Sequence, residues 1–163
     1  MKKNQGFSTI ELLVVIAFIA IMLAITFGYT IRNKDRINLK DDANKITGEI
    51  YKIKQRTARE SRTIRMTFTS NSYSYFRWDG AMWQPLDEIG YRGGETAFNV
   101  TINNPADFCI NSRGLVVKPD APNQFELLGT QTIELRSDGD KGTDEINIKL
   151  YPYGGIKVEK DFK

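Results

Sequence analysis

Few side chains in this 163-residue sequence are suited to chemistry, and the most unusual of them is a carboxylate, Glu11. It stands immediately before residues 12–31, none of which carries a charge. A carboxylate beside hydrocarbon is costly, and such groups are usually retained where a partner neutralises them. We therefore expect Glu11 to have a positively charged partner.

The composition excludes most enzymatic chemistry. The sequence has no histidine and a single cysteine, Cys109. A Ser-His-Asp triad and an internal disulfide are therefore impossible, and most zinc-type sites are absent. No nucleophile elbow, phosphate-binding loop or paired-carboxylate motif stands out. We expect a protein that is not an enzyme and that uses no cofactor.

The acidic segment 137–145, SDGDKGTDE, is the place where a metal ion could be held. It offers hard oxygen ligands of the kind that calcium prefers, from Asp138, Asp140, Asp144 and Glu145. Their spacing does not match an EF-hand loop, and acidic glycine-rich hairpins are usually just solvated. We expect no metal site, with calcium at these four carboxylates as the alternative.

The uncharged segment 12–31 has the length of a membrane helix. Twenty residues of α-helix rise about 30 Å, which matches the hydrocarbon thickness of a bilayer. Lys2 and Lys3 precede the segment, so the positive-inside tendency places the N-terminus in the cytoplasm and the following domain outside it. A cleaved secretory signal is disfavoured because the apolar run has no A-x-A-like end. A plain anchor fits the length but does not explain Glu11.

The stretch Gly6-Phe7-Ser8-Thr9-Ile10-Glu11-Leu12-Leu13 resembles the processing site of the type IV pilin superfamily, in which a short basic leader ends in Gly, Phe follows and Glu is the fifth mature residue. The resemblance implies that a prepilin peptidase cuts between Gly6 and Phe7 and methylates the new amino group of Phe7. It also implies assembly through the N-terminal helix by an inner-membrane assembly platform. In the apolar core of such a filament, Glu11 should pair with the amino group at Phe7 of an adjacent subunit.

Residues 32–62 keep a helical rhythm but are charged. Small or apolar residues recur at alternating intervals of four and three, which is the pattern of one face of an amphipathic helix: Leu39, Ala43, Ile46, Ile50, Ile53 and Thr57. We expect one helix from about residue 7 to residue 62, with this face packed on the chain's own strands. Residues 32–65 hold 11 Lys or Arg against 5 Asp or Glu, whereas residues 66–163 hold 10 against 14.

From residue 63 the period changes to two, with β-branched and aromatic residues that are typical of strands. Asp79-Gly80 predicts a hairpin turn. Further strands are expected at 97–102, 108–110, 115–118, 132–136, 145–151 and 156–160.

The sequence thus predicts an α+β fold in which a long N-terminal helix packs on an antiparallel β-sheet head. Its expected parts are a leader peptide at 1–6, a transmembrane or filament-core helix at 7–31, an amphipathic stem helix at 32–62 and a β-rich head at 63–163.

The order of these elements, with FCINSRG at 108–114 and the late hairpin EINIKLYPYGGIKVEK, is similar to the H-type minor pseudopilins of type II secretion and to the FimT/FimU-like minor pilins. The resemblance implies a minor subunit of a pseudopilus or type IV pilus, with a periplasmic or extracellular head and other pilin or pseudopilin subunits as partners. The sequence lacks the Cys pair of many major pilins, and its tail KVEKDFK lacks the clustered arginines of DNA-binding members.

Two alternatives remain open. The basic stem and the aromatic tract SYSYFRW at 72–78 are compatible with a DNA-uptake minor pilin, because Arg and stacked aromatic rings can hold single strands. Alternating aromatic residues in a strand more often build a core, so we do not expect nucleic acid as a partner. The other alternative is a membrane-tethered adhesin or binding head in which the processing motif is accidental.

Overall fold

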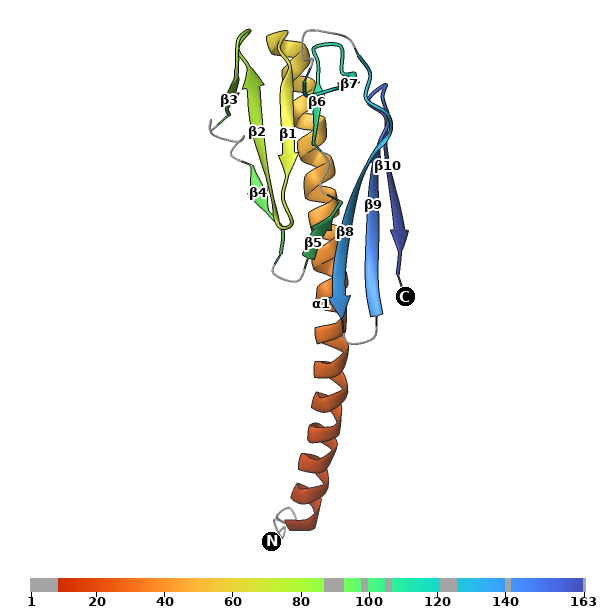
Figure 1. Cartoon of the computed structure of the whole chain (residues 1–163). Helices are drawn as coiled ribbons and strands as arrows, with labels where there is room; N and C mark the ends of the chain where they lie inside the picture. Colours follow the sequence, from red (N-terminus) through yellow and green to blue (C-terminus); the bar gives the residue numbers. More distant parts are fainter. Residues whose placement is uncertain are drawn as a thin grey trace. The chain divides into compact units, whose positions relative to one another are not determined.

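The computed structural model describes residues 9–86, 93–97, 100–104, 107–120, 126–139 and 142–162. In these residues one α-helix is followed by ten β-strands (Figure 1). The chain divides into two compact units, residues 1–34 and residues 35–163. The second unit contains the later part of the helix together with every strand.

The helix α1 runs from Thr9 to Glu60 and is 52 residues long. It ends where Ser61 takes a φ of 52°, a left-handed conformation that interrupts the helical hydrogen-bond series. Arg59 lies in the last turn, where a positive charge complements the negative end of the helix dipole. The expected helix from about residue 7 to residue 62 is confirmed from Thr9 to Glu60, and it ends two residues earlier than expected.

The strands form two antiparallel sheets. The strands are β1 (Ile64–Phe68), β2 (Ser72–Trp78), β3 (Trp83–Pro85), β4 (Gly94–Glu95), β5 (Val100–Asn103), β6 (Asp107–Ile110), β7 (Val116–Val117), β8 (Gln131–Gly139), β9 (Gly142–Leu150) and β10 (Ile156–Asp161). The first sheet has the order β3-β2-β1-β6-β7, with β4 also paired to β2, and the second sheet has the order β10-β9-β8-β5. The predicted α+β class is confirmed.

The hairpin predicted at Asp79-Gly80 connects β2 to β3. The Asp79 carboxylate accepts backbone hydrogen bonds from Ala81 and Met82, both at 2.8 Å. These bonds, that from Met82 first, lower the pKa of Asp79. Gly80 takes a φ of 109°, which a residue with a Cβ rarely adopts. Asp and Gly each therefore serve the turn for a separate reason.

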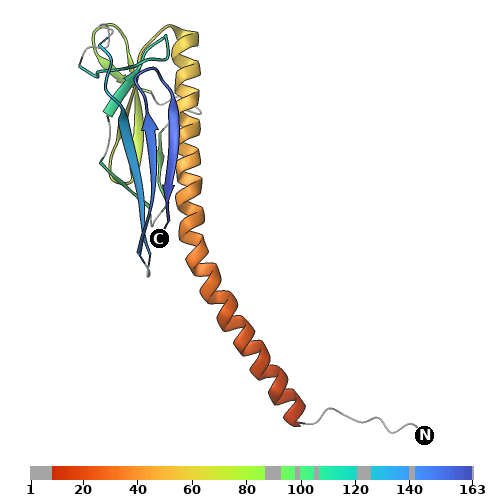
Figure 2. The same cartoon turned by 90° about the vertical axis from the view of Figure 1, so that its right-hand side faces the viewer.

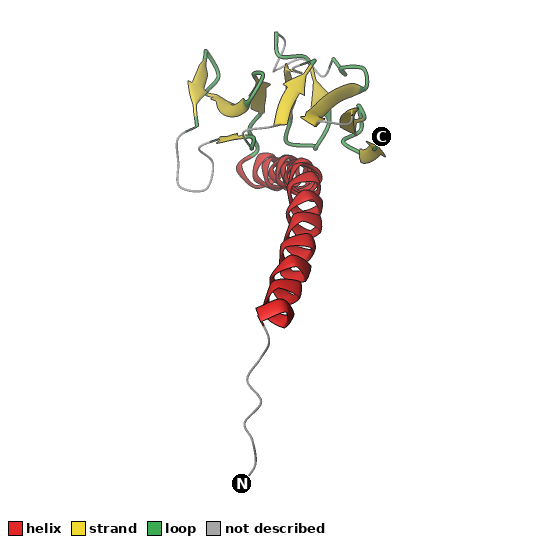
Figure 3. Ribbon diagram, turned by 90° about the horizontal axis from the view of Figure 1, so that it is seen from below, coloured by secondary structure: helices red, strands yellow, loops and turns green. Residues whose placement is uncertain are grey.

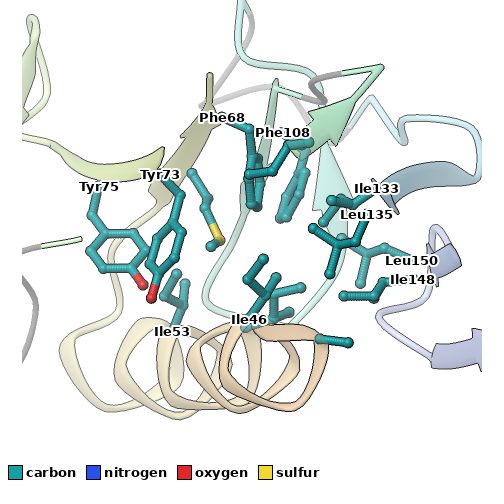
Figure 4. Close-up of a cluster of buried hydrophobic side chains, with 14 of the residues drawn as sticks. Ile46, Ile53, Phe68, Tyr73, Tyr75, Phe108, Ile133, Leu135, Ile148 and Leu150 are labelled. Carbon is teal, nitrogen blue, oxygen red and sulfur yellow. The ribbon is translucent and has the colours of Figure 1, made fainter. Parts of the chain in front are cut away.

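The later part of α1 lies along one side of both sheets (Figures 2 and 3). The helix face predicted from the spacing is buried: each of its six residues is 2% exposed or less, namely Leu39, Ala43, Ile46, Ile50, Ile53 and Thr57. Figure 4 shows Ile46 and Ile53 beneath aromatic side chains of the first sheet and aliphatic side chains of the second. The expected packing of this face on the chain's own strands is confirmed.

Among the residues that the structure describes, the hydrophobic core lies in the unit 35–163. Its buried members run from Leu39 to Leu150 and include Phe108, Ile133 and Ile148, each fully buried. The first buried core residue among those described is Leu39, so the unit 35–163 contains the apolar contacts that stabilise its own fold.

Candidate functional site

The apolar segment of α1 is exposed among the residues that the structure describes. Residues 9–26 are all exposed, and the helix Thr9–Thr26 has a mean hydropathy of 2.6. Leu13, Phe18 and Met22 are 65%, 66% and 67% exposed. Contact of such a surface with water is costly by about 25 cal/mol for each Å² of apolar area. By its length and composition the segment could cross a membrane.

The backbone of this segment suits an apolar environment. A helix satisfies its own backbone hydrogen bonds, which hydrocarbon cannot do. The hydroxyl of Thr26 donates to the carbonyl oxygen of Met22 at 2.8 Å. The one polar side chain near the end of this stretch is therefore hydrogen-bonded within the helix.

Glu11 lies in the first turn of α1. The N-terminus of a helix carries partial positive charge, which favours a carboxylate there. The helix thus presents a negatively charged group at the beginning of an exposed apolar surface. Gly6 and Phe7, the residues of the expected cleavage and methylation, lie outside the described residues, so their geometry gives no test of that expectation.

Polar contacts fix the beginning of the helix in unit 35–163 to the second sheet. Arg36 donates two hydrogen bonds to the Asp144 carboxylate on β9, at 2.7 Å and 3.2 Å. The hydrogen bond to Asp144 raises the pKa of Arg36. Phe162 lies just after β10. The centroid of its ring is 5.5 Å from the guanidinium carbon of Arg36 and 5.1 Å from Nζ of Lys40. This cluster joins the helix to the two C-terminal strands.

Further along, the helix holds the segment 93–97. Asp42 accepts a hydrogen bond from the backbone N–H of Ala97 at 2.7 Å, and Lys45 donates to the carbonyl oxygen of Glu95 at 3.1 Å. Asp42 is only 8% exposed, so its hydrogen bond to the backbone offsets the cost of burying the carboxylate.

A tyrosine pair connects the helix to β2. The Tyr75 hydroxyl donates to Glu49 at 3.1 Å. Burial, followed by the Glu49 charge, raises the pKa of Tyr75 and raises that of Tyr73 from 10.0 to about 12. Both tyrosines are 5% exposed or less. The aromatic tract 72–78 therefore supplies core residues at Tyr73 and Tyr75, as its alternation favoured.

Two of the four candidate calcium ligands are engaged by arginines. Asp144 is bound by Arg36, and Glu145 pairs with Arg136 at 2.6 Å. The Asp138 side chain and Asp140 lie outside the described residues. Within the described part of the chain, no three His, Cys, Asp or Glu residues gather in a way that could hold a metal ion. Calcium binding at Asp138, Asp140, Asp144 and Glu145 stays an untested alternative.

Cys109 is unsuited to nucleophilic chemistry. Its side chain is fully buried on β6, and burial raises the pKa of its thiol to about 12. A thiol with that pKa is almost entirely protonated near neutral pH, and the thiolate is the reactive form.

Sequence reasoning did not find the contacts that join α1 to distant strands. Arg36 and Asp144 are separated by 108 positions, and Tyr75 and Glu49 by 26. A local pattern identifies the buried face of a helix, but it does not identify which charged residue meets which strand. The excess of positive charge in residues 32–65 was the sequence feature that could have indicated these contacts. Part of that charge pairs with carboxylates of the acidic head, as Arg36 does with Asp144.

The fold is similar to a known solved structure. No family model matches the chain, and no curated protein matches its sequence. The structure of the minor pseudopilin EpsH from the Type 2 Secretion System of Vibrio cholerae aligns with a TM-score of 0.58 and 9% sequence identity, over 76% of this chain and 97% of that chain. The chain therefore has the same fold as that minor pseudopilin, as its sequence resemblance implied.

Proposed function

We propose that this protein is a non-enzymatic structural subunit, a minor pseudopilin or minor pilin, of a type II secretion pseudopilus or a type IV pilus. The observation that carries the proposal is an exposed apolar helix, Thr9–Thr26, with Glu11 in its first turn and a pilin-like head after it. Before assembly the helix spans the cytoplasmic membrane, and during assembly it moves into the apolar core of a filament. Its partners are other pilin or pseudopilin subunits and an inner-membrane assembly platform.

In this proposal a prepilin peptidase removes residues 1–6 and methylates the amino group of Phe7. The N-terminus lies on the cytoplasmic side, because Lys2 and Lys3 precede the apolar segment, and the head lies outside the cytoplasmic membrane. The new amino group at Phe7 is positive and Glu11 is negative. In a dry filament core each group needs the other, because an unpaired buried charge is strongly destabilising.

The proposal is tested by replacing Glu11 in the full chain, produced in cells that contain the complete assembly machinery. Glu11→Gln removes the charge and keeps the shape. Leaving the partner's amino group unpaired costs about 3 kcal/mol or more, so incorporation into sheared filaments should fall about 100-fold. Membrane insertion should not change, because the apolar segment is intact.

Glu11→Asp serves as the matched control, since it keeps the charge and should retain measurable incorporation. Both variants are quantified in the membrane fraction and in the filament fraction. Normal incorporation of Glu11→Gln would contradict the proposed pairing.

A further inference from the structure

The first turn of α1 in the unit 35–163 is held to the strands differently from the turns that follow. The two units divide between Lys34 and Asp35, and the first buried core residue among those described is Leu39. Residues 35–38 therefore belong to this unit but precede its apolar core. Ile37, the one apolar side chain among these four, is 54% exposed. Apolar burial thus contributes little to holding this turn against the strands.

Charged and aromatic groups hold the turn instead. Arg36 donates to the carboxylate of Asp144 from Nε at 2.7 Å and from Nη2 at 3.2 Å. The Phe162 ring lies within the range of cation–π attraction from both Arg36 and Lys40. We call these four residues the helix clamp: Arg36, Lys40, Asp144 and Phe162.

The helix clamp is accessible to solvent. The side chains of Arg36 and Asp144 are 30% and 15% exposed, so water and salt reach their ion pair. Ion pairs with such access are weak, and salt screens them. The buried residues from Leu39 onward are packed against both sheets and have no such access. Regions with few buried apolar contacts open at a lower free energy than the core, so the helix clamp should open first.

We propose that the helix clamp is a releasable contact, which sets whether the part of α1 bound to the strands begins at Arg36 or at Leu39. In the closed state the ion pair and the cation–π contacts hold residues 35–38 against β9 and Phe162. In the open state these contacts are lost, and about one more turn of helix is free of the strands. The buried face from Leu39 onward stays packed in both states. Minor states of this kind hold about 0.1–10% of the molecules.

Ionic strength is the condition that shifts this equilibrium. Salt weakens the attraction between Arg36 and Asp144, whereas the apolar packing from Leu39 onward has no charge to screen. High salt should therefore open the helix clamp and leave the rest of the unit folded. The inference uses only residues of the unit 35–163, so it does not depend on the proposed function.

The test measures the distance between the first turn of the helix and β10 in the full chain, held in detergent micelles. Spin labels are attached to cysteines that replace Ile37 and Lys157, because both side chains are more than half exposed, and Cys109 is too buried to be labelled. Pulsed electron spin resonance gives the fraction of molecules at the longer, open distance. Asp144→Asn removes the negative charge of the helix clamp and keeps the shape of the side chain.

Asp107→Asn is the matched control. Asp107 also accepts hydrogen bonds from an arginine, but that residue, Arg65, lies on β1 and not on the helix. We expect the open fraction to rise about fivefold in Asp144→Asn, because a well-formed pair is at the upper end of the range for exposed ion pairs, and to change little in Asp107→Asn. Raising NaCl from 50 mM to 1 M should increase the open fraction when Asp144 is present and leave it unchanged in Asp144→Asn.

Two further results would overturn the proposal or support it. An unchanged open fraction in Asp144→Asn, or an equal rise in both variants, would overturn it. Thermal unfolding of Asp144→Asn, followed by circular dichroism, should stay cooperative with a similar melting temperature, because the core from Leu39 onward is intact. Loss of cooperative unfolding in that variant would show that the contact is part of the folded core and not releasable, and the proposal would fail.

Discussion

Two isoleucines on opposite sides of α1 give a direct test of which face of the stem the head covers. Ile50 is fully buried against the strands, whereas Ile37 is 54% exposed. Each is replaced by alanine in a chain that begins at Asp35, because the buried core residues among those described lie within the unit 35–163. The two variants share the same residue change and the same helix, and they differ in burial and in distance from the new N-terminus.

The expected magnitudes follow from that burial. Removing a fully buried Ile side chain costs about 3 kcal/mol, through lost apolar contact and the cavity that remains. Because about half of the Ile37 side chain is already exposed, its replacement removes only about half as much apolar contact. The higher helix propensity of alanine offsets about 0.4 kcal/mol of the remaining loss of stability. The net cost of Ile37→Ala should therefore be about 1 kcal/mol or less.

Urea unfolding followed by circular dichroism measures both changes. With an m-value of about 1.5 kcal/mol/M, Ile50→Ala should lower the midpoint by about 2 M and Ile37→Ala by about 0.7 M or less. If Ile37→Ala were the more destabilising variant, the helix would face the strands with its other side, and the assignment of the face Leu39–Thr57 to the core would fail.

Three further predictions concern stability. Gly154→Ala should lower the free energy of unfolding by about 2 kcal/mol or more, because φ is 76° there and the new Cβ would meet the Gly114 carbonyl oxygen at 2.2 Å. Gly48→Ala, at a helical site with nothing within 4 Å, should raise it by about 0.5–1 kcal/mol in the same urea titration, and a loss there would refute the account of α1. Stability should also fall as the pH rises above 10, because the pKa of Tyr73 is raised to about 12 and that of Tyr75 is raised, so the unfolded state loses these protons first. Tyr75→Phe should make the decline in melting temperature between pH 9 and pH 11 shallower, and an unchanged slope would show that Tyr75 does not contribute to it.

The sequence predicted those parts of the fold that depend on local spacing. The alternation of four and three between Leu39 and Thr57 identified the buried face, because the period of a helix fixes which residues share a side. Asp79-Gly80 identified the β2–β3 turn, because that backbone requires a positive φ. The strand predicted at 97–102 begins at Val100, and the two-residue strand β4 was not predicted because it exists only through its pairing with β2.

Contacts between distant residues could not be predicted in this way. Asp144 was considered as a calcium ligand because it lies in an acidic segment, yet it binds Arg36, 108 positions earlier. Lys54 of α1 donates to the carbonyl oxygen of Gly154, 100 positions later, and no local motif marks that bond. For the candidate site, Glu11 was identified from sequence because a carboxylate beside an apolar run is costly wherever the chain folds.

The central claim, that this chain is processed and assembled as a pilin-like subunit, is tested most directly by mass spectrometry of its N-terminus. The full chain is produced in cells with a prepilin peptidase, and Gly6→Val, which crowds the expected cleavage site, is the control. The account predicts a mature chain that begins at Phe7 with one added methyl group, and an unprocessed Gly6→Val chain. An intact Met1 in the wild-type protein, under conditions in which a known prepilin is cleaved, would contradict the claim.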